Sequence, residues 1–326
     1  MQETPLTEVN EAAPTTLKQM VGQRSVVEQV AVALAAAVAD NRPFDHALLV
    51  GPAGVGKTQT ARVIAQEIGG GFHDVLGQAL ETPADLNALP LEAKERDVVF
   101  IDEAALIPSE QQHALLLALD QRKIVLAGGK TGKAPHSIRL CNFSLLLATT
   151  DEYRLIGPLI DRMRLVLRFK FYGKADLEEI TRQRFRALRW NIDEDLPMEI
   201  AKRSRGVPRL ALRLAQAARR VCRAEGEFII RQHHLHRACA LEQIDDIGLG
   251  PTEQHYMNVL AGGACRLNVI ASMLGLPART VTQVVEPFLL RVKGGLVIKD
   301  DQGRRLLTAK GREHLLRASH QVEEQP

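Results

Sequence analysis

Gly51-Pro-Ala-Gly-Val-Gly-Lys-Thr58 is the stretch that decides the fold, and it lies between the apolar run His46-Ala-Leu-Leu-Val50 and the helix-prone residues 59–68. A strand, a glycine loop and a helix start in this order form a cradle for nucleotide phosphates. The glycines let successive backbone N–H groups turn toward one anion, and the helix N-terminus adds partial positive charge. The stretch therefore predicts binding of ATP or GTP. A glycine-rich turn without a ligand would leave Lys57 unexplained.

The positions of this loop have distinct expected roles at the phosphates. We expect Lys57 to reach the outer phosphates and Thr58 to offer its hydroxyl to Mg²⁺. The other positions contribute backbone N–H groups and the first helical turn. The predicted nucleotide contacts are Gly51, Gly54, Val55, Gly56, Lys57, Thr58 and Gln59.

A second strand carries the acids that hydrolysis requires. Asp97-Val-Val-Phe-Ile-Asp-Glu103 places an Asp-Glu pair directly after four apolar residues, which is typical of a buried parallel strand. We expect Asp102 to hold the Mg²⁺ shell and Glu103 to orient and polarise the attacking water. Ordinary solvated acids at a strand end are the alternative, which the preceding phosphate loop disfavours. The pair predicts a nucleotide hydrolase.

The composition is that of an intracellular globular protein. The chain has 326 residues, 45% of them hydrophobic, which is enough for two or three domains. No apolar run approaches the roughly 20 residues that span a bilayer, and the N-terminus has no basic cluster before Lys18, unlike a signal peptide. We therefore expect a soluble, cytoplasmic protein without membrane contact. The four cysteines lack Cys-x-x-Cys spacing, which favours buried thiols over zinc ligands or disulfides.

Charge is unevenly distributed along the chain. Residues 1–150 hold 12 basic and 17 acidic residues, a net charge of −5, whereas residues 182–237 hold 14 and 6, a net charge of +8. Residues 291–326 hold 8 and 5, a net charge of +3. Basic segments joined to an acidic one indicate contact with a polyanion such as a nucleic acid. Solvated helix faces, or contacts to the nucleotide and to other subunits, are the alternatives.

The order of elements predicts an α/β fold in which a parallel-sheet ATPase core is followed by an all-α lid and a C-terminal winged helix. The predicted strands cover 46–50, 73–76, 98–102, 144–149 and 164–169. The predicted boundaries are a flexible arm over 1–16, the core over 17–174, the lid over 175–249 and the last domain over 250–326. Within the core, residues 121–141 are predicted to form a projecting hairpin, which is either a partner contact or a variable surface loop.

The lid and the last domain each contain a distinctive motif. Pro208 opens a helix in the turn Arg205-Gly-Val-Pro-Arg209, so Arg209 projects from the helix start toward a nucleotide; a surface arginine is the alternative. Residues 268–285 predict a helix-turn-helix, and residues 296–308 predict the two strands of a wing. We expect this domain to contact DNA, although winged helices also bind proteins. The predicted DNA contacts are Arg279, Arg304 and Arg305.

Together, these motifs resemble the RuvB family, the Holliday-junction branch-migration motors among the AAA+ ATPases. The resemblance covers about residues 17–318 and includes the phosphate loop and the Asp-Glu strand. Its most specific part is the Gly-Val-Pro-Arg turn combined with the Glu-Pro-Phe-Leu segment. The remaining motifs are Val21-Gly-Gln23, Phe44-Asp-His46, Ala148-Thr-Thr150, Pro158-Leu-Ile-Asp-Arg162, Gly206-Val-Pro-Arg209, Val285-Glu-Pro-Phe-Leu289 and Gly303-Arg304.

The resemblance implies roles for further residues and for partners. Thr149 or Thr150, with Thr150 preferred, would be the first sensor of the γ-phosphate, and Arg162 would be the arginine finger that enters the next subunit's site. It also implies ATP and Mg²⁺ as cofactors, a hexameric ring around duplex or four-way-junction DNA, and a hairpin that docks a junction-binding protein of the RuvA type. The implied adenine pocket and second sensor are formed by Val21, Gly22, Pro208 and Arg209.

The chain departs from the family pattern in the acid strand, the finger and the wing. The His-Arg pair that usually follows the acids is absent from Asp102-Glu-Ala-Ala-Leu-Ile107. The usual Arg-Phe-Gly-Ile is Arg162-Met-Arg-Leu165, so Arg164 is a second candidate for the finger, and two acids enter the wing at 300–305. Two functions remain open: a DNA branch-migration motor in recombination and repair, or a RuvB-derived ATPase that acts as a clamp-loader-like or remodelling switch on a protein partner.

Overall fold

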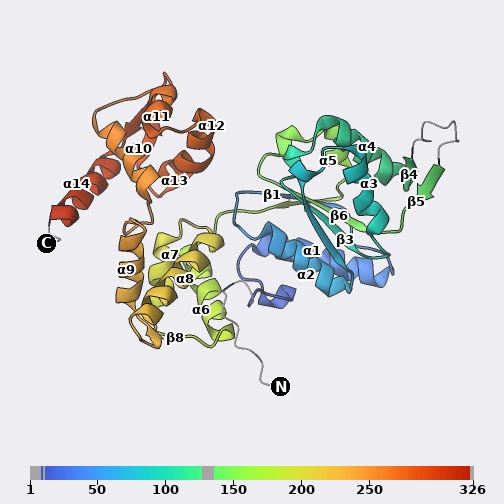
Figure 1. Cartoon of the computed structure of the whole chain (residues 1–326), viewed down its shortest axis with the longest axis horizontal. Coiled ribbons are helices and arrows are strands. Elements are labelled where there is room, and N and C mark those ends of the chain that lie inside the picture. Colours follow the sequence, from blue (N-terminus) through green and yellow to red (C-terminus); the bar gives the residue numbers. More distant parts are fainter. Residues whose placement is uncertain (1–8, 10–11, 127–135, 324–326) are drawn as a thin grey trace. The chain divides into compact units, whose positions relative to one another are not determined.

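The computed structural model describes residues 9, 12–126 and 136–323. The chain divides into two compact units (Figure 1). The first consists of Met1–Leu188 together with Gly206–Arg209, and the second of Arg189–Arg205 together with Leu210–Pro326. Most of the predicted arm over 1–16 lies outside the described residues.

A five-stranded sheet forms the centre of the first unit. Its strands are β1 (Ala47–Val50), β2 (Phe72–Leu76), β3 (Val98–Asp102), β6 (Ser144–Thr149) and β7 (Leu165–Arg168), which confirms the predicted strands to within one residue at each end. All neighbouring strands run parallel, in the order β2-β3-β6-β1-β7. Their carboxyl ends therefore meet at one edge of the sheet, which is where ligands bind in folds of this class.

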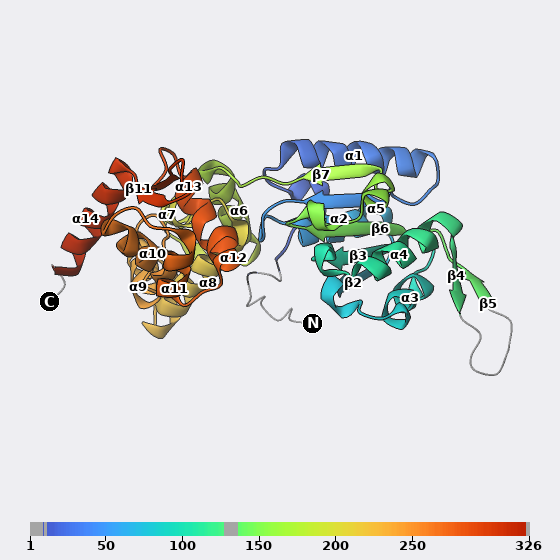
Figure 2. The ribbon, with the colours of Figure 1, turned by 90° about the horizontal axis from the view of Figure 1, so that it is seen from above.

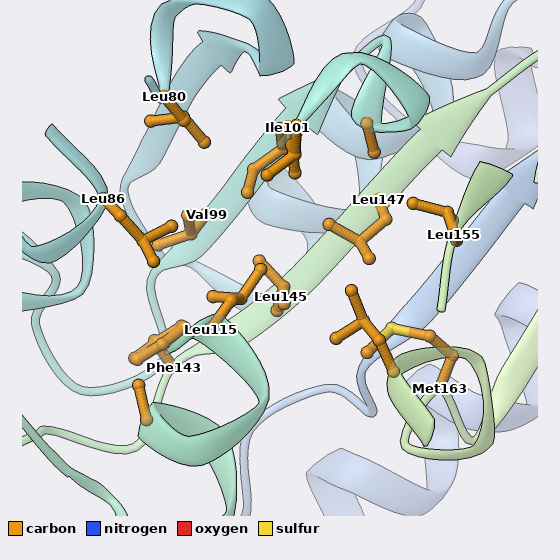
Figure 3. Packing of buried hydrophobic residues seen from close by; sticks show 14 of the residues in the cluster. Leu80, Leu86, Val99, Ile101, Leu115, Phe143, Leu145, Leu147, Leu155 and Met163 are labelled. Atoms are coloured by element: carbon orange, nitrogen blue, oxygen red, sulfur yellow. The ribbon is translucent and has the colours of Figure 1, made fainter. Parts of the chain in front are cut away.

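Helices cover both faces of this sheet (Figure 1). Because side chains alternate along a strand, Leu146 and Ala148 of β6 pack with α1 (Arg24–Ala39) and α2 (Lys57–Ile68). The opposite face, which includes Leu145 and Leu147, packs with α3 (Pro83–Glu92), α4 (Ser109–Gln121) and α5 (Gly157–Asp161), as Figure 3 shows. Burial on both faces explains the continuous apolar runs of the strands.

A small antiparallel hairpin lies outside the main sheet and follows α4 (Figure 2). It consists of β4 (Lys123–Leu126) and β5 (His136–Arg139), which confirms the hairpin predicted within residues 121–141. Arg122 ends α4 in a left-handed conformation, and its carbonyl accepts a hydrogen bond from Leu140 N at 2.9 Å. The residues that join the two strands, 127–135, lie outside the described residues.

The second unit contains the helices α7 (Leu196–Arg203), α8 (Pro208–Ala224) and α9 (Gln232–Leu241), which lie within the predicted all-α lid over 175–249. The first two residues of α8 are grouped with the first unit. Two short parallel strands, β8 (Asn191–Ile192) and β9 (Ile229–Ile230), accompany these helices. The helix α6 (Lys174–Ala187) is grouped with the first unit, and its assignment to the lid stays a prediction.

The C-terminal part of the second unit has the predicted helix-turn-helix and wing. Its apolar core includes the fully buried Tyr256, Ile270 and Leu289. The sequence did not predict the flanking helices α10 and α14, although Tyr256 of α10 belongs to this core. The elements are α10 (Pro251–Ala261), α11 (Leu267–Leu274), α12 (Ala278–Thr280), the π-helical turn η5 (Val281–Val285), α13 (Glu286–Arg291), β10 (Val297–Lys299), β11 (Arg305–Leu307) and α14 (Ala309–Glu323).

Candidate nucleotide site

The phosphate loop lies between β1 and α2 at the carboxyl edge of the sheet, as predicted. Because α2 begins at Lys57, its unpaired N–H groups face the loop. Gly54 has a φ of +77°, and a Cβ there would lie 2.8 Å from Val207 Cγ1 and 3.1 Å from Arg209 Cβ. Only glycine therefore combines the left-handed backbone with this close packing.

Lys57 is largely buried under the loop, with 7% of its surface exposed. Its Nζ donates to the carbonyl oxygens of Gly51 and Pro52, each at 2.8 Å. Burial lowers the pKa of Lys57; the charge of Asp102 opposes this shift, and that of Arg209 adds to it. A buried ammonium is stabilised by an anionic partner, so the environment of Lys57 suits a phosphate ligand.

Two oxygen ligands suited to Mg²⁺ meet beside the loop. Thr58 Oγ1 donates to Asp102 Oδ2 at 3.1 Å, which joins the start of α2 to the end of β3. Mg²⁺ takes oxygen ligands, commonly one or two from the protein together with water and substrate phosphates. The hydroxyl and the carboxylate at this spacing fit that ion. The structure thus brings together the two residues predicted to hold it.

Glu103 follows Asp102 and opens the short 3-10 helix η3 (Ala104–Leu106). Its backbone is left-handed, with a φ of 51°, and its N–H donates to Asp102 Oδ1 at 2.9 Å. This conformation costs a non-glycine residue about 1–2 kcal/mol, and such strain often occurs at functional sites. The side chain is exposed and has no hydrogen-bond or ion-pair partner in the described part of the chain. Its carboxylate is therefore available to a water molecule.

The strand β6 delivers Thr149 and Thr150 to the same edge. Thr149 is buried, with 2% exposure, and its Oγ1 accepts a hydrogen bond from Asp151 N at 2.9 Å. Thr150 is exposed. The alternation along β6 assigns Thr150 to the face that includes Ala148 and packs with α2, the helix that begins at the phosphate loop. Exposure and position both favour Thr150 as the group that contacts a phosphate.

The turn that carries Pro208 and Arg209 lies against the phosphate loop. Arg209 N donates to Gly54 O at 3.3 Å, and Tyr172 N donates to Gly206 O at 2.9 Å. All of these residues belong to the first unit, although the chain on both sides of the turn belongs to the second. The structure therefore places the predicted second sensor beside the predicted phosphate cradle.

Tyr172 is a site residue that the sequence reasoning missed. Its hydroxyl donates to Val55 O at 3.3 Å, and burial raises the pKa of Tyr172 to about 12, so the group remains a donor. Gly22 has a φ of +70°, and a Cβ there would lie 2.6 Å from the Tyr172 ring. The ring thus joins the Val21-Gly22 segment to the phosphate loop. The contact joins residues far apart in the chain, so no spacing in the sequence marked Tyr172.

The side chain of Gln59, which was predicted to contact the nucleotide, has a partner outside the phosphate loop. Its side-chain amide donates to Pro14 O at 2.7 Å. The Gln59 side chain therefore contacts the N-terminal segment, and its predicted role at the nucleotide rests on its backbone.

Arg162 and Arg164 lie on the link between α5 and β7. Arg162 Nε contacts Asp120 Oδ1 at 2.7 Å, and Arg164 Nη1 contacts Asp45 Oδ1 at 3.1 Å. Neither arginine contacts the phosphate loop of its own subunit within the described residues. Their side chains are 55% and 73% exposed. Both are therefore accessible to a neighbouring molecule, as an arginine acting in trans requires.

The wing changes the predicted set of DNA contacts. Arg279 is exposed, and the Arg304 side chain is 41% exposed while it pairs with Asp300 at 2.7 Å. Arg305, in contrast, is 8% exposed, and its Nε contacts Oε1 of the buried Glu286 at 2.7 Å. A buried guanidinium held by a carboxylate cannot reach a phosphate, so the prediction for Arg305 is wrong.

A second group of metal-ligand side chains, Glu225, Glu227, His233 and His234, lies between α8 and α9. Arg231 N donates to His234 Nδ1 at 2.9 Å, and His234 Nε2 lies 3.2 Å from Glu225 Oε2. Glu225 and Glu227 also pair with Arg237 and Arg231, respectively. These two carboxylates therefore belong to an ion-pair network within the second unit.

Comparison with known proteins identifies the family. The RuvB P-loop domain of Holliday junction DNA helicases matches residues 12–169, the RuvB AAA lid domain matches 172–245, and the RuvB C-terminal winged helix domain matches 246–316. The protein of Synechococcus sp. (strain JA-3-3Ab) named Holliday junction branch migration complex subunit RuvB 2 is 36% identical over 307 residues, 93% of this chain and 82% of its own length. The chain belongs to the RuvB family.

Other RuvB proteins agree with this assignment. The RuvB subunit of Prochlorococcus marinus (strain MIT 9313) is 35% identical over 93% of this chain and 87% of its own length. The solved structure of the Thermotoga maritima RuvB Holliday junction branch migration motor has a TM-score of 0.80 at 30% identity, covering 93% of this chain and 98% of that one. These matches confirm the predicted fold class and the nucleotide-binding core of RuvB. Among the described residues, no helix is both long and apolar enough to cross a membrane.

Proposed function

We propose that this chain is the ATP-hydrolysing subunit of a motor that translocates duplex DNA and drives branch migration of Holliday junctions in recombination and repair. The observation that carries the proposal is the Thr58–Asp102 contact, which joins the phosphate loop to the acid strand in a chain of the RuvB family. The relatives support it, because their names describe a branch migration complex and a branch migration motor.

The chain itself provides the groups that hydrolysis needs. The loop N–H groups and Lys57 bind the triphosphate, which compensates the buried ammonium. Thr58 and Asp102 are the residues that would hold Mg²⁺, which supplies positive charge against the phosphate oxygens when bound. Glu103 orients the attacking water, and Thr150 contacts the γ-phosphate. The Glu103 carboxylate, which has no partner within the part of the chain that the structure describes, and the exposed Thr150 support these roles.

The adenine pocket is proposed to lie between the Val21-Gly22 segment and Tyr172, with Pro208 at its border. The packing of the Tyr172 ring against Gly22 supports this assignment. Arg209 is proposed to act as the second sensor, because its backbone already lies on the phosphate loop at Gly54. Hydrolysis would then change the contacts of the turn that precedes the lid helix α8.

The motor is proposed to be a homo-oligomeric ring, as a hexamer in the cytoplasm, in which Arg162 completes the site of the next subunit. The exposed Arg162 side chain supports this role. We assign ATP hydrolysis to residues 17–174, the lid to 175–249 and DNA contact to 250–326. Arg279 and Arg304 are the proposed DNA contacts, and the hairpin over 121–141 is proposed to dock a junction-binding protein of the RuvA type.

A four-way-junction assay tests the motor. ATP turnover is measured with and without duplex or four-way-junction DNA, and it is expected to rise when DNA is present. Junction unwinding is measured with and without a RuvA-type protein. Arg162→Ala should abolish turnover while nucleotide binding persists, whereas Arg164→Ala should retain it. Failure of every DNA to stimulate turnover, with or without the RuvA-type protein, would refute the proposal.

A second function, a clamp-loader-like or remodelling switch on a protein partner, is favoured by the wing. Arg305 is buried and Arg304 is paired with Asp300, which reduces the free positive charge that the wing presents to DNA. If this function is correct, a protein partner will stimulate turnover and DNA will not.

A further inference from the structure

Asp120 and Arg162 form a two-point ion pair where α4 ends. Arg162 Nε lies 2.7 Å from Asp120 Oδ1, and Arg162 Nη2 donates to Asp120 Oδ2 at 2.9 Å. The carboxylate therefore meets one side of the guanidinium through two N–H···O contacts. Bidentate pairing of this kind fixes the direction and the plane of the guanidinium, which a single contact does not.

The pairing leaves the outer side of the guanidinium available. Arginine has five N–H donors, and this arrangement uses the Nε–H and one of the two on Nη2. The other three have no protein acceptor among the residues that the structure describes, and the side chain is 55% exposed. Asp120 thus orients Arg162 without occupying the side that would meet a phosphate.

Asp120 and Arg162 both lie next to buried residues in the chain. Asp120 lies in the last turn of α4, two residues after the buried Ala118, and Arg162 precedes the buried Met163. Arg162 N also donates to Leu159 O at 3.2 Å, and Leu159 is fully buried. Ala118, Leu159 and Met163 belong to one hydrophobic cluster, so the core already fixes the two backbones relative to each other. The ion pair adds the orientation of the side chain.

Arg164 lacks an equivalent arrangement. It makes one contact of 3.1 Å with Asp45 Oδ1, and the same oxygen accepts from Arg42 Nη1 at 2.8 Å. Asp45 is therefore shared between two arginines and does not fix the plane of either through both oxygens. This difference favours Arg162 over Arg164 as the finger, and it makes Asp45 a matched control.

From these contacts we infer that Asp120 is a positioning residue for Arg162 in ATP hydrolysis. The inference rests on the proposed role of Arg162 in the neighbouring subunit's site. A guanidinium held in place beforehand loses less side-chain freedom when it meets the transition state. An interaction that is made only in the transition state changes kcat and leaves ground-state binding of the substrate unchanged. Loss of the Asp120 carboxylate is therefore expected to lower kcat roughly tenfold while KM stays within about twofold.

The variants Asp120→Asn, Asp120→Glu and Asp45→Asn test this inference in the full chain with junction DNA. Asp120→Asn is expected to show the kcat loss, Asp120→Glu to recover most of it, and Asp45→Asn to resemble the wild type. Thermal unfolding of the two Asp120 variants should be nearly unchanged, because an exposed ion pair contributes about 0–1 kcal/mol. Equal kcat in Asp120→Asn and the wild type would overturn the inference.

Mixed rings separate positioning from a local structural defect. In a mixture of Asp120→Asn and Glu103→Gln subunits, an Asp120→Asn subunit keeps its own acid and can receive an intact finger from its neighbour. Turnover per Asp120→Asn subunit should therefore exceed that of rings made from this variant alone. No recovery would overturn the inference.

A parallel mixture distinguishes failure of the inference from failure of the proposed function. Arg162→Ala mixed with Glu103→Gln should recover turnover if Arg162 acts in trans. Recovery there, with normal kcat in Asp120→Asn, would overturn only the role of Asp120. Full turnover by Arg162→Ala alone would overturn the finger itself and, with it, the proposed shared site.

Discussion

The neighbouring wing arginines Arg304 and Arg305 are expected to respond to substitution in opposite ways. Glu286, only 1% exposed, contacts Arg305 Nε at 2.7 Å, accepts from the Tyr256 hydroxyl at 3.0 Å and lies 3.2 Å from Lys299 Nζ. Burial opposes the charged form, but the hydrogen bonds from Arg305 and Tyr256 hold the pKa of Glu286 below its usual value. Arg305 therefore stabilises the base of the wing.

The expected magnitude follows from this environment. Removing one partner of a buried ion pair costs about 3–5 kcal/mol, because the other charge stays buried. Arg305→Met keeps an apolar stem, and Lys299 and Tyr256 remain next to Glu286, so we expect the lower end, ~3 kcal/mol. That corresponds to a roughly hundredfold larger equilibrium constant for local opening. Arg304→Ala removes only a surface partner of Asp300 and should cost less than ~1 kcal/mol.

Hydrogen exchange of the full chain, followed by mass spectrometry, measures this difference at β10, β11 and α13. Arg305→Met should speed exchange there, and Arg304→Ala should not. Binding of junction DNA at several salt concentrations gives the second measurement. If Arg304 contacts a phosphate, Arg304→Ala should reduce the slope of log K against log salt by about 0.9. Unchanged exchange in Arg305→Met, combined with a reduced salt slope for DNA binding by that same variant, would refute the reasoning.

Three further outcomes are expected. Burial, with Arg122 and Arg164 nearby, lowers the pKa of His46 from 6.5 to about 4. Between these two pH values the unfolded chain therefore binds a proton that the folded chain does not, and the free energy of unfolding falls as the pH drops from about 6.5 to 4, by ~2 kcal/mol at pH 5. Urea unfolding at several pH values should show this fall in the wild type and not in His46→Gln. An equal pH dependence in the two proteins would count against the low pKa of His46. Gly22→Ala should weaken ATP binding roughly tenfold in a fluorescent-nucleotide titration, because its Cβ would enter the Tyr172 ring at a left-handed backbone position; unchanged affinity would exclude a pocket at this position. Glu103→Gln should bind ATP normally but hydrolyse it at least about a hundredfold more slowly in a single turnover; normal hydrolysis would show that Glu103 does not orient the water.

The sequence predicts those parts of the fold and site that depend on residues close together in the chain. The glycine spacing of the phosphate loop and the apolar run before Asp102 are local patterns, and the strands they predict agree with β1 and β3. The helix-turn-helix and wing are predictable for the same reason. The turn before α8 was recognisable because Pro208 suits the first position of a helix.

The features that sequence reasoning missed depend on contacts between distant residues. Arg305 is buried because Glu286, on α13, receives its guanidinium, and the adjacent Arg304 faces Asp300 instead. Tyr172 becomes a site residue because Gly22 leaves room for its ring. Neither the pairing nor the packing has a periodicity or spacing in the sequence that would reveal it.

The assignment of Gly206–Arg209 to the first unit limits how this protein can be divided. A fragment that ends at Leu188 would retain Lys57, Asp102 and Glu103 but would lose Arg209 and the packing partners of Gly54. The two units are therefore not separable segments of the chain, because the chain leaves the first unit after Leu188, returns to it at Gly206–Arg209 and then continues in the second. A chimaera between relatives would have to exchange this short turn together with the ATPase core. Recombination at a single junction anywhere in this region would leave at least one of the two units with segments from both parents.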